Sequence, residues 1–243
     1  MILVLLAVEG GYRLGRFRRE RSDQEKEAPV GTMVGATLGL LALLLAFTFG
    51  VAMTRYDARR QALLDEVNAI GTAYLRADLL AEPHRTEVRK LLREYVDIRL
   101  EADQSGNFEP AIRRSVEQHN LLWAQAAVIG EKNPGSIVVG LFIRSLNDMI
   151  DLHSKRVQAA LRSRIPGTIW VALYTVAILA LGAMGYHEGL SGTSRSLAIL
   201  AVAFAFSTAL WLVTDLDRPR AGSLRISQQA MIELRNSMTA PKR

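Results

Sequence analysis

The sequence predicts an integral membrane protein made almost entirely of α-helices. Of its 243 residues, 49% are hydrophobic, and these are concentrated in a few long uncharged blocks instead of being spread along amphipathic elements. The longest blocks reach the roughly 20 residues that a helix needs to cross a bilayer. The region between the blocks has helical periodicity and no alternation typical of a strand. We therefore do not expect a soluble enzyme.

Three segments are long and apolar enough to span a membrane. The run 30–53 contains no charged residue, and as a helix it would extend about 36 Å, enough for a hydrocarbon core of ~30 Å. Two further uncharged runs, 167–186 and 197–213, are separated by the short polar link 187–196. Together these two runs predict a membrane hairpin.

The N-terminal segment 1–8 is apolar but too short to span a membrane, because Glu9, Gly10 and Gly11 follow at once. A signal peptide would carry its charges before the apolar part, whereas here they follow it. We interpret the segment as a short stub, the end of a first span whose start codon is assigned too late. The stub gives the chain a four-span layout.

The region 55–164 is predicted to be helical. Its first helix continues the preceding span, since no Pro or Gly separates them. Later helices are expected between breaks at Pro83, Gly106–Asn107 and Asn133–Gly135, and Ser136 is the expected N-cap of the last one. The chain thus divides into an N-terminal membrane segment, a middle helical region, and a membrane hairpin with a C-terminal tail. Their bounds are 1–54, 55–164 and 165–243.

The distribution of Lys and Arg mildly favours a cytoplasmic middle region. Cytoplasmic loops carry an excess of these residues near span ends, and this orientation places ten of them inside, against seven for the opposite one. The ten are Arg55, Arg59, Arg60, Lys155, Arg156, Arg162, Arg164, Arg218, Arg220 and Arg225. The seven are Arg13, Arg16, Arg18, Arg19, Arg21, Lys26 and Arg195.

Charge and composition limit the partners that we expect. The formal net charge is +6, and the arginines cluster beside apolar blocks without interleaved aromatics. This pattern favours anionic lipid headgroups over nucleic acid as the partner. The absence of Cys excludes disulfides, thiolate metal sites and a Cys nucleophile.

No residue pattern predicts a catalytic centre, a metal site or a cofactor. His153 follows Asp148 and Asp151, which could hold a cation, but the adjacent basic residues favour a solvated helical face. His187 and Glu188 are expected to form an interfacial pair. Neither a glycine-rich phosphate loop nor a nucleophile elbow is present.

A row of small and large apolar residues recurs every fourth position along the first span. Small residues at this spacing let membrane helices approach closely, and composition alone favours this packing role, with Gly31 and Gly35 as the packing residues. In a ring of identical subunits, Leu43 and Phe47 would instead form stacked apolar rings that gate ions by dewetting. The full row is Gly31, Gly35, Gly39, Leu43, Phe47 and Val51, and it leads to Arg55.

The segment LLALLLAFTFGVAMTRYDARR (40–60), followed by a long helix, resembles the second span of bestrophin channels and their bacterial relatives. In those channels a phenylalanine lies eight residues before an arginine flanked by an aromatic, and Phe47, Arg55 and Tyr56 have this spacing. The rest of the chain is similar to a bacterial subgroup called bestrophin-like. The similar stretches are NAIGTAYLRADLL (68–80) and DLDRP (215–219).

The resemblance implies a homopentamer with a central pore, four spans per subunit and both termini in the cytoplasm. It implies that Leu43 and Phe47 line the pore neck. The third neck position falls at Gly39, where bestrophins usually carry a bulky residue. Calcium-activated bestrophins have an acidic cluster after the last span, but here calcium gating is not expected because this place holds only two acidic residues and an arginine. These are Asp215, Asp217 and Arg218.

Two functions from different classes follow. The first is an ion-conducting homo-oligomer in a bacterial inner membrane, with Arg55, Arg59 and Arg60 near the inner mouth of its pore. The second is a non-conducting membrane sensor or scaffold whose middle helices bind a partner. Burial of Phe47 between helices of one subunit would favour the second function, whereas an open environment would favour the first.

Overall fold

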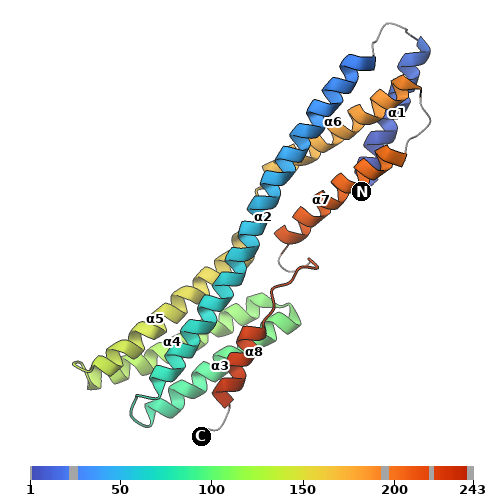
Figure 1. Cartoon of the computed structure of the whole chain (residues 1–243). Coiled ribbons are helices and arrows are strands. Elements are labelled where there is room, and N and C mark those ends of the chain that lie inside the picture. The colour runs from blue at the N-terminus through green and yellow to red at the C-terminus, as the bar shows by residue number, and fades with distance from the viewer. Residues whose placement is uncertain (1, 22–26, 193–196, 219–221, 240–243) are drawn as a thin grey trace. The chain divides into compact units, whose positions relative to one another are not determined.

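The computed structural model describes residues 2–21, 27–192, 197–218 and 222–239, and within these ranges the chain is helical with no strand (Figure 1). It divides into two compact units. The first comprises Met1–Tyr56 and Arg164–Leu224, and the second comprises Asp57–Ser163 and Arg225–Arg243. Four residues named above lie outside the described ranges. They are Lys26, Arg195, Pro219 and Arg220.

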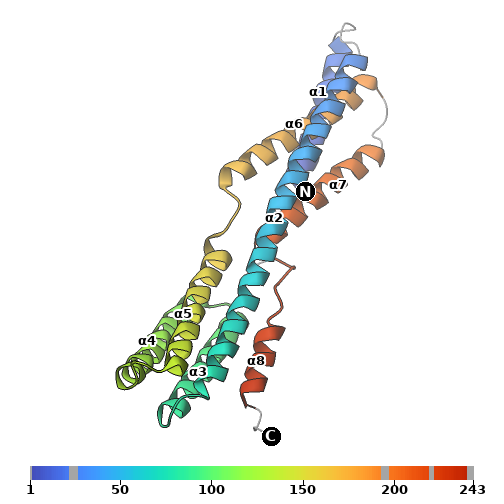
Figure 2. The same ribbon diagram turned by 60° about the vertical axis from the view of Figure 1, so that its left-hand side comes forward.

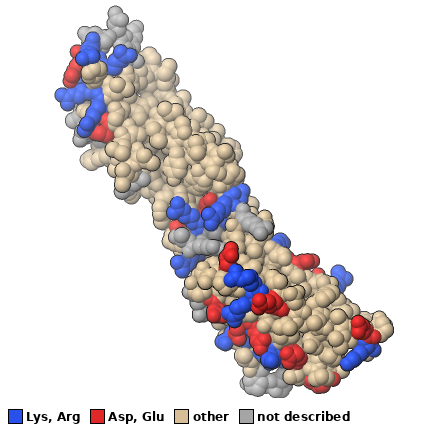
Figure 3. Space-filling view, turned by 180° about the vertical axis from the view of Figure 1, so that it is seen from behind, with Lys and Arg blue, Asp and Glu red and all other residues tan. Residues whose placement is uncertain are grey.

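The first unit contains the membrane-spanning helices. Helices α2 (Glu27–Ala77), α6 (Gly167–Ser191) and α7 (Leu197–Asp217) are each long and apolar enough to cross a bilayer. This confirms the three predicted spans. The space-filling view shows a broad zone without charged side chains on this unit, with Lys and Arg gathered at its end (Figure 3). Such an uncharged surface is what a hydrocarbon environment requires.

Helix α1 (Ile2–Arg21) does not end where the sequence suggested. It continues through Gly10 and Gly11 to Arg21, and it lies side by side with α6 (Figure 1 and Figure 2). A Cβ atom at Gly11 would clash with the carbonyl oxygen of Gly182, and one at Gly185 would clash with the carbonyl oxygen of Val8. The backbones therefore touch, and this contact supports the helix beyond its apolar stub.

The second unit is a bundle built from the remainder of α2 and four further helices. These are α3 (His84–Ser105), α4 (Phe108–Lys132), α5 (Ile137–Val157) and α8 (Gln229–Thr239). The predicted continuation of α2 past Met53 is confirmed, as are two predicted helix ends. Gly106 ends α3 with a φ of 68°, and the Ser136 side chain caps α5 by accepting a hydrogen bond from the Val139 backbone amide.

The core of the second unit explains why its helices are amphipathic. Large side chains from α2, α3, α4 and α5 are completely buried against each other. They include Ile70, Leu92, Tyr95, Leu122, Phe142, Leu146 and Met149. Helix α8 adds Met231 and Met238 to this core. The Tyr74 hydroxyl donates a hydrogen bond of 2.8 Å to the Met238 carbonyl oxygen, so the C-terminal segment belongs to this unit and not with the hairpin.

Candidate functional site

Helix α2 packs against the first unit through only one of its faces. Val34, Leu41 and Leu45 contribute to the same apolar core as residues of α1, α6 and α7, and Ala52 joins a second cluster with Val213. Thr48 is buried on the same face, and Leu38 and Leu44 are partly buried against this core. Much of the surface of α2 in this unit is uncovered in a single subunit.

The row recurring every four residues lies on this uncovered side. Cβ atoms added to Gly35 and Gly39 would meet nothing within 4 Å. Further along the row, Leu43 is 52% exposed and Phe47 is 66% exposed. The row is consequently not buried between helices of its own subunit, which is the arrangement that would favour packing within one chain.

Only the first glycine of the row has a close neighbour: a Cβ atom on Gly31 would lie 2.9 Å from Nε2 of His187. The glycines that bring backbones together are instead on α1 and α6. They are Gly11, Gly15, Gly182, Gly185 and Gly189. This contact was not predicted from the sequence, although two pairs of these glycines have the four-residue spacing typical of close membrane-helix packing.

The three arginines expected at a pore mouth have different surroundings. Arg55 continues the row and is partly buried, and Arg60 is exposed. Arg59, which belongs to the second unit, is 4% exposed. Of the three, Arg60 is the most open to solvent in a single subunit.

The C-terminal aspartates bind backbone groups of their own unit. Asp217 accepts a hydrogen bond of 2.9 Å from the Ile165 amide just before α6. Asp215 accepts bonds from the Ser223 amide (2.7 Å), the Ser223 hydroxyl (2.9 Å) and the Leu224 amide (3.0 Å). Both carboxylates therefore fix the chain around α7. The exposed Arg218 follows them.

A buried polar cluster in the second unit was not predicted from the sequence. Glu66 on α2 is completely buried. It accepts hydrogen bonds from the Tyr95 hydroxyl (2.6 Å) and Nη1 of Arg156 (2.5 Å). Nε of Arg99 and Nδ1 of His153 each lie 3.4 Å from the same carboxylate. The cluster thus joins α2, α3 and α5 around one negative charge.

The arginines keep this buried carboxylate ionised. Burial alone would raise the pKa of Glu66, but the charges of Arg99 and Arg156 and the hydrogen bonds from His153 and Tyr95 hold its pKa far below the usual range. Two positive charges therefore share one buried negative charge. An uncompensated buried charge is very unfavourable, so Glu66 is essential to this arrangement.

The histidines of this cluster correct one expectation. His153 was predicted on a solvated face of α5, but it is buried, whereas Asp148 and Asp151 are exposed. Its ring packs against His119, whose centroid lies 4.8 Å away. Burial and the neighbouring His153 lower the pKa of His119 to about 4. Among the described residues, no group of three His, Asp or Glu side chains is placed to hold a metal ion.

Comparison with known structures identifies the fold. A single-substitution variant of a bacterial bestrophin homologue from Klebsiella pneumoniae is similar with a TM-score of 0.74 and 13% identity, over 98% of this chain and 96% of that chain. Another variant of that homologue gives 0.69 and 15% over the same shares. A third structure, described only as a membrane protein, gives 0.71 and 13%, again over 98% and 96%. At these identities the likeness shows the fold.

The sequence itself places the chain in a family. No curated protein sequence gives a significant match to it. The profile of the bestrophin-like domain, however, matches residues 1–231, which is nearly the whole chain. The chain therefore belongs to the bestrophin-like family of membrane proteins.

Proposed function

We propose that the chain is the subunit of a homo-oligomeric channel for small inorganic ions in a bacterial inner membrane, with five subunits around a central pore. The family and the fold support this proposal. In it, Gly39, Leu43 and Phe47 line the neck of the pore, and Arg55, Arg59 and Arg60 lie towards its inner mouth. Catalysis has no part in this function.

The observation that carries the proposal is the uncovered row on α2. The large apolar side chains of Leu43 and Phe47 are more than half exposed in a single subunit, while another face of α2 is packed against the apolar core. A symmetric ring would bring five copies of this row together around one axis. Each of the two side chains would then form an apolar ring.

Apolar rings explain how such a neck would control ions. An ion entering a dry constriction loses its water ligands and gains no polar replacement, which opposes its passage. The neck would be wider at the level of Gly39, because glycine has no side chain. The basic side chains of α2 would attract anions to the mouth and anionic lipid headgroups to the membrane surface.

The alternative is a non-conducting membrane sensor or scaffold. The observation that favours it is a set of exposed apolar side chains on α4, which a partner protein could cover. They are Val116, Leu121, Trp123 and Val128. In this alternative the row on α2 contacts lipid or a neighbouring helix and no pore forms.

The test is Phe47→Ala in the purified, reconstituted oligomer, with its mass measured first. We expect an intact oligomer with a larger conductance, because truncation widens and wets the neck. Phe49→Ala is the matched control, since Phe49 is also exposed on α2 but lies outside the row, and its conductance should equal that of the wild type. A monomer, or equal conductance of both variants, would refute the neck assignment.

A further inference from the structure

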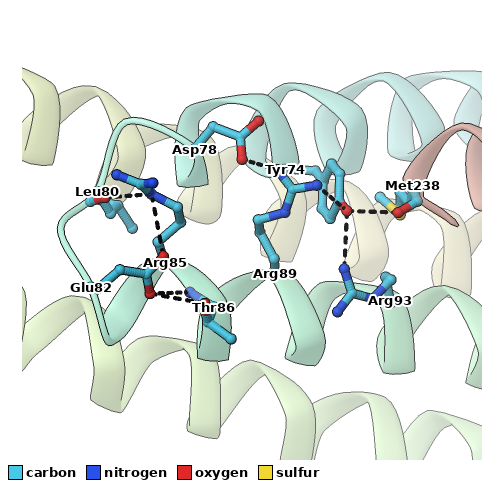
Figure 4. A network of polar contacts seen from close by, with 9 residues as sticks. All are labelled: Tyr74, Asp78, Leu80, Glu82, Arg85, Thr86, Arg89, Arg93 and Met238. Carbon is cyan, nitrogen blue, oxygen red and sulfur yellow. Dashed lines mark hydrogen bonds and ion pairs between the residues drawn. The ribbon is translucent and has the colours of Figure 1, made fainter. Parts of the chain in front are cut away.

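Three arginines share one face of α3 at the end of the second unit. Arg85, Arg89 and Arg93 are spaced by four residues, so they stand above one another on the helix (Figure 4). They line a cavity of about 240 Å³ together with Asp78 and Thr86. Like charges at this spacing repel each other, so the three positive charges require negatively charged or polar partners.

Two of the arginines already have fixed partners. Arg89 forms an ion pair with Asp78, donates a hydrogen bond of 2.6 Å to the Tyr74 hydroxyl and lies 4.2 Å above the Tyr74 ring. Arg85 donates a hydrogen bond of 2.9 Å to the Leu80 carbonyl oxygen. These contacts, drawn in Figure 4, hold both guanidinium groups in place.

Arg93 is the uncompensated member. Its Nη1 donates a hydrogen bond of 3.1 Å to the neutral Tyr74 hydroxyl, and within the described ranges it forms no ion pair. Glu82 does not line the cavity, but its carboxylate lies 3.8 Å from Nε of Arg85 and also accepts hydrogen bonds from the Thr86 amide and hydroxyl at 3.3 and 2.8 Å. Asp78 therefore pairs with Arg89 and Glu82 with Arg85, and Arg93 is the arginine of the wall that has no carboxylate partner among the described residues.

The size and chemistry of the cavity select the ligand. At about 240 Å³ it is smaller than the ~300 Å³ or more typical of sites for drug-sized molecules, so it suits a small anion or one charged group of a larger molecule. Planar guanidinium groups present paired N–H donors that match phosphate oxygens. A spherical monovalent ion would use this geometry poorly.

We propose that Arg85, Arg89 and Arg93 form a binding site for a phosphate group on the second unit, in which Arg93 supplies the free charge and Asp78 and Tyr74 hold Arg89 in place. The phosphate group could belong to a soluble phosphorylated molecule or to a lipid headgroup. This site is separate from the proposed pore residues, and its occupancy does not depend on conduction.

Binding is measured by titration calorimetry on the full-length protein in detergent, at constant ionic strength in sodium chloride. One arm uses pyrophosphate and the other uses dioctanoyl phosphatidic acid below its critical micelle concentration. We expect saturable binding in at least one arm. Binding of pyrophosphate alone identifies a soluble ligand, binding of the lipid alone identifies a headgroup, and binding of both identifies the shared phosphate chemistry.

Arg93→Gln should weaken this binding by about tenfold or more, because it removes one charge-assisted contact. The affinity of Arg93→Lys should lie between those of the wild type and Arg93→Gln. Arg113→Gln is the control: Arg113 is an exposed arginine of α4, 3.8 Å from Glu109, and its loss should leave binding unchanged. Thermal unfolding without ligand verifies the fold of each variant, and Arg85→Gln replaces Arg93→Gln if the latter does not fold. Absence of saturable binding in both arms, or equal binding by the Arg93 and Arg113 variants, would overturn the proposal.

Discussion

Replacing Glu66 with Gln should destabilise the second unit far more than any surface carboxylate would. The substitution keeps the shape of the side chain but removes its charge. It leaves two cations facing a neutral amide, the buried Arg99 and the largely buried Arg156, whose side chains are 7% and 12% exposed. Glu66 has no exposed surface, so water cannot replace the lost negative charge as a partner of the two arginines. Breaking a buried ion pair on one side costs about 3–5 kcal/mol, and we expect a loss in this range.

The assay is amide hydrogen exchange of the full-length protein, followed by mass spectrometry of peptides from α3 and α5. A loss of 3 kcal/mol corresponds to roughly 100-fold faster exchange in the most protected core. Glu101→Gln is the matched control, since Glu101 pairs with Arg114 at 2.7 Å while both side chains are more than half exposed. Exposed pairs contribute about 1 kcal/mol or less. Equal exchange in both variants would refute the view that burial makes the Glu66 cluster important.

Three further predictions concern protonation, helix packing and orientation. The pKa of His119 in the folded chain, about 4, lies below its ordinary value of 6.5. Between these two pH values the unfolded chain therefore binds more protons than the folded chain. The free energy of unfolding should be highest above about pH 6.5 and fall by up to ~3 kcal/mol as the pH approaches 4. His119→Phe should make the free energy of unfolding, measured across this range, less dependent on pH. Gly11→Ala should lower the thermal midpoint because its Cβ atom meets the Gly182 carbonyl, whereas Gly10→Ala, next to open space, should not; equal midpoints would contradict the α1–α6 contact. Ser105 is exposed and the chain has no Cys, so Ser105→Cys introduces a single accessible thiol. This thiol should resist an impermeant maleimide in intact cells if the middle region is cytoplasmic. Labelling before lysis would show that the topology is the reverse.

The helices were predictable because local chemistry determines them. Uncharged runs of span length must be helical in a bilayer, so α2, α6 and α7 followed from composition. Gly106 and Ser136 marked helix ends through a positive φ and a side-chain cap, which act within a few residues. The continuation of α1 beyond Gly11 was missed because its support comes from α6, more than 150 residues later in the chain.

The candidate sites were less predictable because they depend on contacts between distant residues. Glu66, Tyr95 and Arg156 form one cluster only after α2, α3 and α5 have packed, and none of these residues stands out in the sequence. Helix α8 was missed for a similar reason: it is short, and Met231 is buried only because α8 packs against the core of the second unit. The row containing Phe47 was visible because its four-residue period lies on a single helix.

The central claim is that identical subunits form an ion-conducting pore lined by the row on α2. The most direct test is the current through the purified wild-type oligomer in a planar bilayer, with chloride and sodium replaced in turn by large impermeant ions. We expect discrete openings and a shift of the reversal potential when the permeant ion is replaced. An intact, correctly folded oligomer that carries no current under any of these conditions would contradict the claim and favour a sensor or scaffold.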